Sequence, residues 1–321
     1  MKDKLLKLLQ ENDEYLSGEA ISQEFNVSRT AVWKQINSLR KEGYEIESVT
    51  NRGYKLVHNS TGINSAGISA AIKTNSLGHK IICLNEVGST NDYAKKIASE
   101  GAENGTLIIA EQQNSGRGRL GRNWSSSKGK GIWMSIILKP NIEPQKAQII
   151  TLASSIAVVK ALRPLLSDRV KVKWPNDVLV DGKKICGILT EMNCELENIN
   201  YLVVGMGINV NHVIVDFPEM LRDTATSINI ELGGQQKIER TPIIADVLNA
   251  FEELYLLILE GKTDKVIYDW RCMSATLGKK VKFKYQNEEL SGIAEDITDE
   301  GVLLVRDSSD KIHRIFYGEI I

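Results

Sequence analysis

The sequence has few of the features that mark secreted or metal-dependent proteins. Its four cysteines are scattered along apolar segments without a C-x-x-C pair, which favours reduced core thiols over a zinc site or a disulfide framework. The four histidines are equally dispersed and offer no ligand spacing. We therefore expect no protein-built metal centre from Cys83, Cys186, Cys194, Cys272, His58, His79, His212 or His313.

Long apolar runs are also missing. No stretch reaches the ~20 uninterrupted apolar residues that a membrane span needs. The first apolar cluster, at residues 5–9, is interrupted by Lys7 and is followed by Glu11 and Asp13, which excludes a signal-peptide core. We expect a soluble, cytoplasmic protein that has no membrane partner.

The chain has no excess of either charge. Lys plus Arg number 40 against 41 for Asp plus Glu, so no overall field attracts nucleic acid, and any such binding must be local. Hydrophobic residues make up 42% and charged residues 25%, which excludes disorder and leaves enough apolar side chain for a sizeable core. At roughly 100 to 200 residues per domain, the 321 residues predict two or three domains.

The first part of the chain predicts two short helices that meet at a tight turn. Ser17 is an N-cap residue for a helix that runs to Phe25, and Asn26 suits its C-terminus. Ser28 is a second N-cap residue, and the apolar residues behind it repeat at helical spacing until Gly43.

A hairpin follows these helices. Residues 44–49 alternate like a strand, residues 50–53 form a turn, and residues 54–56 return as a second strand. Together with an earlier helix over residues 5–9, this order predicts a winged helix-turn-helix domain over residues 1–60, with Arg52 at the tip of the wing.

The second helix of the pair has a basic polar face. It holds no acidic residue, and its Arg, Lys, Asn and Thr side chains suit phosphates and base edges. A protein-interaction domain with a solvated basic side is the alternative. Since the domain is otherwise rich in acidic residues, we expect it to bind DNA as a dimer on two half-sites. The predicted DNA-binding residues are Ser28, Arg29, Thr30, Trp33, Lys34, Asn37 and Arg52, and Arg40 and Lys41 share the same face.

A polar segment without periodicity, residues 58–67, predicts a linker. Beyond it, short β-rich runs alternate with helical stretches at 92–100 and 145–166, so we expect an α+β or α/β domain. The predicted strands are residues 80–84, 106–110, 132–138, 170–174, 185–192 and 201–207.

The most unusual segment is residues 115–122, in which three arginines alternate with glycines after a predicted strand. Its G-x-G-x-x-G spacing does not open a helix, which excludes a Rossmann fingerprint. A P-loop is excluded as well, because Arg122 and Asn123 stand where Lys and Ser or Thr are needed. The segment is a cationic loop able to close over an anion, or alternatively an RG-type surface loop.

A second polar cluster lies where a predicted strand ends. Alternation places Lys171 and Lys173 on one strand face, and Pro175 ends the strand before Asn176 and Asp177. A carboxylate beside lysines could hold Mg²⁺ on a nucleotide, and a plain salt-bridged strand end is the alternative. A turn at 181–182 then presents Lys183 and Lys184, which the pattern alone would leave solvated.

The tail is β-rich. Residues 279–283, 289–295, 301–306 and 311–316 alternate apolar and polar side chains, with turns at 286–287 and 308–309. A helical stretch at 243–259, and a further one that holds Trp270, close the central domain before it.

Taken together, these motifs resemble the biotin protein ligases, and the front domain is similar to that of the bifunctional ligases that also repress the biotin operon. The resemblance covers essentially the whole chain. It rests on Gly88-Ser89-Thr90-Asn91, Gln112-Gln113, Gly116-Arg117-Gly118-Arg119-Leu120-Gly121-Arg122, Lys173-Trp174-Pro175-Asn176-Asp177, Lys184 ahead of Gly187-Ile188-Leu189, and Gly205-Met206-Gly207-Ile208-Asn209.

The resemblance implies an α+β multidomain fold. It implies a class II synthetase-like α/β catalytic domain with a mixed sheet over residues 68–273, behind the winged helix-turn-helix. It also implies a small SH3-like β barrel over residues 274–321. The bifunctional relatives often carry a further arginine at the position of Leu120, which leaves catalysis intact and bears on ligand-coupled dimerisation.

The implied reaction has two steps. Biotin and ATP, with Mg²⁺, give biotinyl-5'-adenylate and pyrophosphate, and then one lysine of the biotin carboxyl carrier protein of acetyl-CoA carboxylase attacks the adenylate. Lys184 and Arg119 carry over as catalytic residues. The implied biotin-binding residues are Ser89, Thr90, Asn91, Gln113, Arg117, Gly118, Arg119 and Lys184, and the nucleotide-binding residues are Lys173, Asn176, Asp177 and Asn209, with Mg²⁺ near Asp177.

The implied regulation joins the two halves of the chain. The adenylate-bound form would dimerise and bind operator DNA. A biotin-sensing repressor without ligase activity and a lipoate-type ligase are the alternatives. Lys184 and the complete basic loop argue against the first, and the front domain and the Lys-Trp-Pro-Asn-Asp motif argue against the second.

Overall fold

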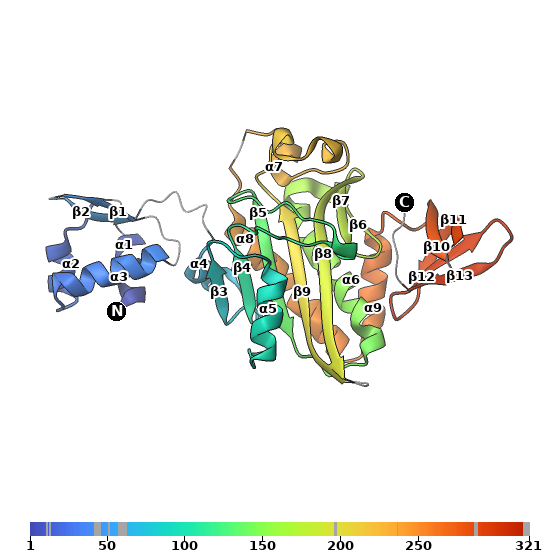
Figure 1. The fold of residues 1–321 in the computed structure, drawn as a ribbon, viewed down its shortest axis with the longest axis horizontal. Coiled ribbons are helices and arrows are strands. Elements are labelled where there is room, and N and C mark those ends of the chain that lie inside the picture. Colours follow the sequence, from blue (N-terminus) through green and yellow to red (C-terminus); the bar gives the residue numbers. More distant parts are fainter. Residues whose placement is uncertain are drawn as a thin grey trace.

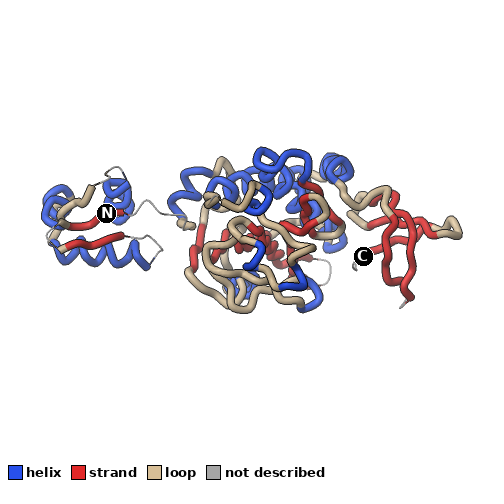
Figure 2. The backbone as a smooth tube through the Cα atoms, turned by 90° about the horizontal axis from the view of Figure 1, so that it is seen from above, coloured by secondary structure: helices blue, strands red, loops and turns tan. Residues whose placement is uncertain are grey.

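The computed structural model describes residues 1–10, 12, 14–41, 46–50, 52–56, 63–195, 198–235, 237–285 and 288–316. They form a small helical module with a two-stranded sheet, a central part around a seven-stranded sheet, and a C-terminal four-stranded sheet. Figures 1 and 2 both show the helical module at one end and the C-terminal strands at the other. The expected α+β multidomain fold is confirmed.

The N-terminal module has the predicted winged helix-turn-helix order. Two serine caps start its helices as expected, because Ser17 Oγ accepts the Ala20 N–H at 3.0 Å and Ser28 Oγ accepts the Ala31 N–H at 3.2 Å. Asn26, at the turn between them, has a φ of 51°, which suits the end of a helix. The elements are α1 (Lys2–Gln10), α2 (Gly18–Glu24), α3 (Arg29–Lys41), β1 (Ile46–Val49) and β2 (Gly53–Leu56).

Apolar residues from all three helices and both strands form one core in this module. Leu5, Ile21, Ile36, Ile46 and Leu56 are each buried in it. The predicted helix stop at Gly43, the first two residues of the hairpin (44–45) and Asn51 of its turn lie outside the described residues.

The central sheet has the order β3-β4-β5-β9-β8-β7-β6 and is mixed, since β3 and β4 are parallel and all other neighbours are antiparallel. This confirms the expected mixed sheet. Its long central strands, β8 and β9, pair along most of their length. The strands are β3 (Ile81–Leu84), β4 (Leu107–Ala110), β5 (Gly131–Leu138), β6 (Val170–Lys173), β7 (Asp177–Val180), β8 (Lys183–Glu195) and β9 (Asn198–Asn209).

Alternating side chains of the sheet serve two different helix layers. Ile108, Ile137 and Val203 pack under α5 (Thr90–Ser99), whereas Leu107 and Ile136 lie in the large core on the other face. That core is covered by α6 (Ala147–Leu166), α8 (Arg240–Leu259), α9 (Thr263–Met273) and α4 (Ser65–Ala71).

Helix α6 is long and apolar. By length and composition alone it could cross a membrane, but 78% of its most apolar window is buried inside the protein. Its apolar character is therefore that of a helix enclosed on all sides by core.

Two sequence-based expectations need correction. The predicted linker over 58–67 ends too late, because α4 starts at Ser65, capped by Asn64 Oδ1, which accepts the Gly67 N–H at 2.7 Å; residues 58–62 lie outside the described part. Lys183 and Lys184 belong to β8 rather than to a free turn, and β7 was not predicted because only four residues separate Asn176 from the turn at 181–182.

The C-terminal strands form an antiparallel meander, as expected for the small β domain. Residues 308–309 form the predicted turn, and the other predicted turn, at 286–287, lies outside the described residues. The strands are β10 (Lys280–Tyr285), β11 (Glu288–Ile297), β12 (Leu303–Asp307) and β13 (Ile312–Ile315).

Trp174 ties this β domain to the central sheet. Its peptide bond to Pro175 is cis, its backbone N–H donates to Thr276 Oγ1 at 3.0 Å, and its indole N–H donates to Gly301 O at 3.0 Å. The ring is fully buried. The Lys-Trp-Pro-Asn-Asp segment is thus held by residues far along the chain.

Replacing Trp174 with Phe removes the indole N–H and leaves the carbonyl of Gly301 without this donor. We expect the free energy of unfolding to fall by about 1–3 kcal/mol, measured by denaturant unfolding of the full chain. Trp33→Phe is the matched control, since Trp33 is 54% exposed and should change stability by less than ~0.5 kcal/mol. Equal unfolding midpoints for Trp174→Phe and wild type would contradict this assignment.

Candidate active site

A cavity of about 510 Å³ lies over the middle of the central sheet. Its walls come from the start of α5, the glycine-arginine loop, the ends of β6 and β7, the floor strands β8 and β9, and the segment after β9. The sequence-predicted residues for substrate and nucleotide all line it, namely Ser89, Thr90, Asn91, Gln113, Arg117, Gly118, Arg119, Lys173, Asn176, Asp177, Lys184 and Asn209.

One end of the cavity is neutral and rigidly hydrogen bonded. Ser89 caps α5 through its hydroxyl oxygen, which places Thr90 and Asn91 in the first turn. Gln113 Oε1 accepts the Thr90 N–H at 2.8 Å, and Gln113 Nε2 donates to Ser126 Oγ at 2.8 Å. Both ends of the Gln113 amide are therefore oriented before any ligand arrives.

Asn91 is oriented in the same way. Its Nδ2 donates to Leu189 O at 3.1 Å and to Glu191 Oε2 at 2.8 Å, and its Oδ1 lies 2.7 Å from the hydroxyl of Ser135. The amide lies directly over Gly205, where an added Cβ would come within 2.1 Å of Oδ1. Because Gly205 has no side chain, the amide of Asn91 can pack directly against the backbone of β9.

Trp124 forms the floor at the centre of the cavity. An added Cβ would lie 2.4 Å from the indole Nε1 at Gly207 and 3.0 Å from the ring at Gly187, so the ring packs closely against the backbone of both glycines. Lys184 Nζ lies 5.2 Å from the centroid of this ring and 2.7 Å from Asp177 Oδ1. The ammonium is held between an aromatic face and a carboxylate.

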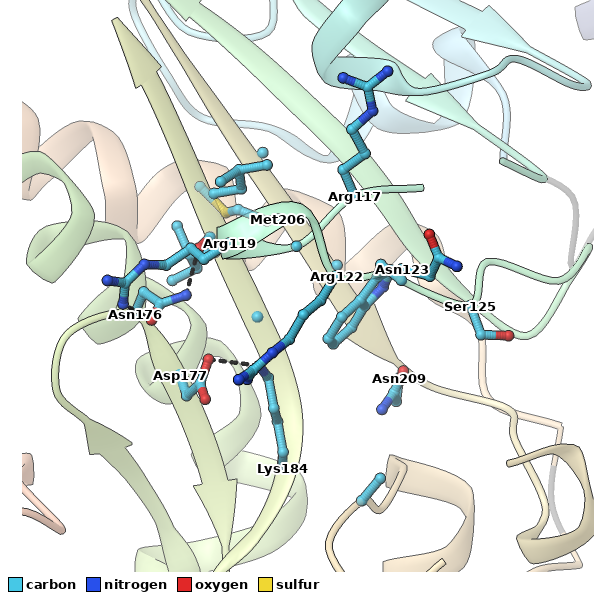
Figure 3. A pocket seen from close by; sticks show the side chains of 18 of the residues that line it. Arg117, Arg119, Arg122, Asn123, Ser125, Asn176, Asp177, Lys184, Met206 and Asn209 are labelled. Carbon is cyan, nitrogen blue, oxygen red and sulfur yellow. Dashed lines mark hydrogen bonds and ion pairs between the residues drawn. The ribbon is translucent and has the colours of Figure 1, made fainter. Parts of the chain in front are cut away.

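The glycine-arginine loop folds back over the cavity. Gly118 N–H donates to Arg122 O at 2.7 Å, and Arg119 Nη1 donates to Asn176 Oδ1 at 2.8 Å. Figure 3 shows Arg119 and Arg122 pointing toward the side of the cavity that holds Asn176 and Asp177.

Arg117 points the other way. Its guanidinium pairs with Asp92 of α5 at 3.2 Å, and Figure 3 shows it directed away from Lys184. The structure thus brings Arg119 to the side of the predicted catalytic lysine and holds Arg117 on the opposite side of the loop.

The lining is strongly cationic. Within the lining residues, which all lie in described parts of the chain, five side chains are cationic and only Asp177 is a carboxylate. Of Lys171, Lys173 and Lys183, the structure places Lys173 in the wall. Such a site attracts phosphates and carboxylates, and its guanidinium groups can form bidentate hydrogen bonds with them.

The described residues contain no group of three or more His, Cys, Asp and Glu side chains that could hold a metal ion. Asn176 and Asp177 present oxygen atoms beside the cationic half of the cavity. This donor set fits Mg²⁺ that arrives on a nucleotide, because such an ion needs only one or two protein carboxylates.

Several wall residues were missed from the sequence. Trp124 follows the loop without any motif that marks it, and Arg122 was counted only as part of the motif. The segment after β9 has no periodicity, yet it contributes a whole wall: Phe217, Pro218, Leu221, Thr224 and Ala225. Asn209 is buried and donates to Thr226 O at 3.0 Å, so its amide holds this segment against β9.

The predicted DNA-binding face is exposed along α3. Ser28, Arg29, Thr30, Trp33 and Lys34 are exposed and Asn37 is half-buried, while Arg52 lies 4.9 Å from the ring centroid of Tyr15. Arg29 pairs with Glu19 of α2, which neutralises part of its charge.

Arg40 differs from the expectation. Its Nε donates to Ile46 O at 3.0 Å, so it holds the wing rather than facing outward, and the side chain of Lys41 lies outside the described part.

Three family models match separate parts of this chain. Residues 84–209 match the biotin/lipoate A/B protein ligase family, residues 2–55 match an HTH domain, and residues 276–321 match the biotin protein ligase C-terminal domain.

Two bifunctional relatives align with nearly the whole chain, and one solved structure aligns with about three quarters of it. The bifunctional ligase/repressor BirA of Bacillus subtilis is 38% identical over 99% of this chain and 97% of its own. The protein of the same name from Escherichia coli is 28% identical over 94% and 91%. A structure of biotin protein ligase from Aquifex aeolicus in complex with biotin and ATP is 28% identical, covers 76% of this chain and 98% of that one, and has a TM-score of 0.64.

Gly205→Ala should displace Asn91, because the new methyl group would lie 2.1 Å from its Oδ1. We expect a loss of about 1–3 kcal/mol in the free energy of unfolding from this overpacking. Gly88→Ala is the control, since nothing lies within 4 Å of an added Cβ there. A Gly205→Ala protein as stable as the control would refute the packing of Asn91 on bare backbone.

The segment after β9 should make stability depend on pH. His212 is buried, stacked on Phe217, and burial lowers its pKa from 6.5 to about 4. His212 therefore binds a proton below about pH 6.5 in the unfolded chain, but only below about pH 4 in the native protein. This contribution to stability is present above pH 6.5 and is lost as the pH falls.

His212→Phe keeps an aromatic ring in the stack and removes the ionisation. Unfolding midpoints measured from about pH 7 down to about pH 4 should fall less for this variant than for wild type, because its ring takes up no proton. Parallel pH profiles for the two proteins would contradict the assignment.

Proposed function

This chain belongs to the family of bifunctional biotin protein ligases and repressors, and from that premise we propose how its cavity performs the reaction. The protein is an ATP-dependent ligase that makes biotinyl-5'-adenylate and transfers biotin, and it also acts as a biotin-responsive repressor. The roles of individual residues below are our assignments.

The neutral end of the cavity binds the ureido ring of biotin. Ser89, Thr90, Asn91 and Gln113 supply donors and acceptors without charge, as an uncharged ring with N–H and C=O groups requires. The amide of Gln113 is already oriented by the Thr90 N–H and Ser126, and that of Asn91 by Leu189 O, Glu191 and Ser135. Such preorganisation lowers the entropy cost of binding.

The cationic half binds the charged groups. Biotin carboxylate and the α-phosphate of ATP are both anions, and bringing them together needs compensating charge. Lys184 supplies it at the centre of the cavity, and Arg119 supplies it from the loop. The observation that carries this assignment is the ammonium of Lys184, held 2.7 Å from Asp177 and above Trp124.

The first step then forms one bond and breaks one. A carboxylate oxygen of biotin attacks the α-phosphorus, and pyrophosphate leaves with the electrons of the broken P–O bond. Asn176 and Asp177 would hold the Mg²⁺ that accompanies ATP, and that ion neutralises phosphate charge when bound. Lys173 and Asn209 line the same cavity, and we assign them to the nucleotide.

The loop that holds Arg117, Gly118 and Arg119 shields the mixed anhydride from water. Exclusion of water is required because the adenylate would otherwise hydrolyse. In the second step the amine of the acceptor lysine attacks the carbonyl carbon of the adenylate and AMP leaves. The acceptor that we propose is the biotin carboxyl carrier protein of acetyl-CoA carboxylase.

The winged helix supplies the repressor activity. We assign operator contacts to Ser28, Arg29, Thr30, Trp33, Lys34, Asn37 and Arg52, on a dimer formed when ligand is bound and with two half-sites. The sequence-based domain bounds are residues 1–60, 68–273 and 274–321; because Ile63 and α4 pack into the central core, we propose that the second domain starts at Ile63. The proposed location is the cytoplasm, where both the carrier protein and the genome are available.

Lys184→Ala should abolish most adenylate synthesis, with a fall of about 10²–10³ in rate as for other charge-stabilising groups. The assay incubates protein, ATP, Mg²⁺, biotin and a carrier domain and measures the intact mass of the acceptor. Lys183→Ala is the matched control, since its side chain is exposed next in sequence and lies outside the cavity wall. Full turnover by Lys184→Ala would count against the role of Lys184. A wild type that binds biotin but never labels the carrier would count against the ligase reaction itself.

Lys34→Ala should weaken operator binding more than Arg29→Ala, because Glu19 already neutralises part of the charge of Arg29. In the variant that combines Lys34→Ala with Arg29→Ala, the slope of log K against log salt concentration should become shallower by about 0.9 for each phosphate contact that is lost. Binding is measured by fluorescence anisotropy on a site selected with the wild type, over a range of salt, with ligation assayed in parallel. Lys139→Ala, far from the winged helix in sequence and exposed, is the control.

A further inference from the structure

The main chain of Lys184 is fixed by a segment outside the regular sheet. Lys184 N–H donates to Thr224 O at 2.7 Å, and Thr226 N–H donates to Lys184 O at 2.9 Å. β9 pairs with β8 only from Cys186 onward, so residues 224–226 take its place beside the start of β8. On one side Lys184 pairs with Leu179 of β7, and on the other its N–H and C=O both bind this segment.

A chain of polar side chains holds the segment from outside the cavity. Thr226 Oγ1 donates to Glu231 Oε1 at 2.6 Å, and the other carboxylate oxygen of Glu231 pairs with Arg169 Nη2. Arg169 Nε in turn donates to Asp181 Oδ2 at 2.7 Å. Asp181 is the first residue of the turn that leads into β8. The Arg169 guanidinium therefore links this turn, through Glu231 and Thr226, to the segment 224–226 that binds the main chain of Lys184.

The inner end of this network is sheltered. Thr226 is 1% exposed, so its hydroxyl needs the partner that Glu231 provides. The side chain of Glu231 is only 11% exposed, whereas Arg169 is half-exposed at the outer end. A pair with one sheltered member is screened less by salt than a surface pair.

The same segment is a wall of the cavity. Thr224 and Ala225 line it beside Lys184, and Gly182 lines it from the turn that Asp181 opens. Arg169 does not line the cavity, but it is linked to this wall through Glu231 and Thr226, and to the turn before β8 through Asp181. Because Lys184 is hydrogen bonded to Thr224 and Thr226, a shift of these residues would act on its main chain.

We propose that Arg169 and Glu231 are positioning residues for Lys184, which set where its ammonium lies when biotin carboxylate and the α-phosphate meet. This rests on the role assigned to Lys184 under the proposed function. The effect is on the adenylation step rather than on binding of the neutral ureido ring, because Ser89, Thr90, Asn91 and Gln113 are held by other groups.

The test uses the full chain and measures single-turnover formation of biotinyl-5'-adenylate. Glu231→Gln keeps an acceptor for Thr226 and removes the charge that binds Arg169, and Arg169→Ala removes the bridge. We expect each variant to slow adenylation about tenfold or more, since misplacement of a catalytic group by about 1 Å can cost 10²-fold. The Kd for biotin and the unfolding midpoint should stay near wild type, and Arg169→Lys should recover part of the rate.

Arg163→Ala is the matched control, because Arg163 lies on the preceding helix and pairs with Asp168 instead of Glu231. Combining Glu231→Gln with Lys184→Ala should slow adenylation no further than Lys184→Ala alone, because the positioned group is gone. An additive double variant would overturn the inference, as would losses of stability and biotin affinity as large as the loss of rate.

The outcomes separate the two proposals. If Lys184→Ala is as active as wild type, the role of Lys184 is wrong and the positioning role is wrong with it. If Lys184→Ala is impaired while Glu231→Gln and Arg169→Ala adenylate at the wild-type rate, the role of Lys184 stands and the positioning role is overturned.

Discussion

The whole site depends on bare backbone at the centre of the sheet. Side chains at Gly205, Gly207 and Gly187 would collide with Asn91 or Trp124, so the glycines decide that these two side chains can lie on β8 and β9. Asn91 in turn fixes the neutral end of the cavity, and Trp124 supports Lys184 at the cationic end. Asn91 and Trp124 can occupy these positions because β8 and β9 have glycine at all three contact points.

Three distant parts of the chain hold the charged half of the cavity. Trp174 ties the segment before Asn176 to the C-terminal domain, and residues 224–226 fix the main chain of Lys184. Arg119 reaches Asn176 from the loop. Each tie satisfies polar groups that burial would otherwise leave unpaired, so the geometry of the site is stabilised by the same bonds that stabilise the fold.

The sequence predicted what repeats or is marked by a motif. The capped helix α3 and strand β6 have a clear period, the buried helix α6 and strands β4 and β5 are long apolar runs, and the site motifs each mark a stretch of wall. β7 was missed because four residues are too few to show a period, and α4 because its small residues are typical of a linker. The segment with Phe217 and Thr224 has no period at all, since its place is set by contacts with β8 and β9 rather than by its own pattern.

One buried ion pair holds the start of the central part close to the cavity wall. The chain re-enters the central part at Ile63, whose N–H donates to Glu111 Oε1 at 2.7 Å, and both oxygens of Glu111 accept from Arg240 Nη2 at 2.9 Å. Arg240 is almost fully buried, so either charge left alone would be strongly destabilising, and the tie holds as a unit. Gln113, at the neutral end of the cavity, follows two residues after Glu111. The ion pair at the start of the central part and Gln113, which we assign to the ureido ring, therefore lie on the same short segment after β4.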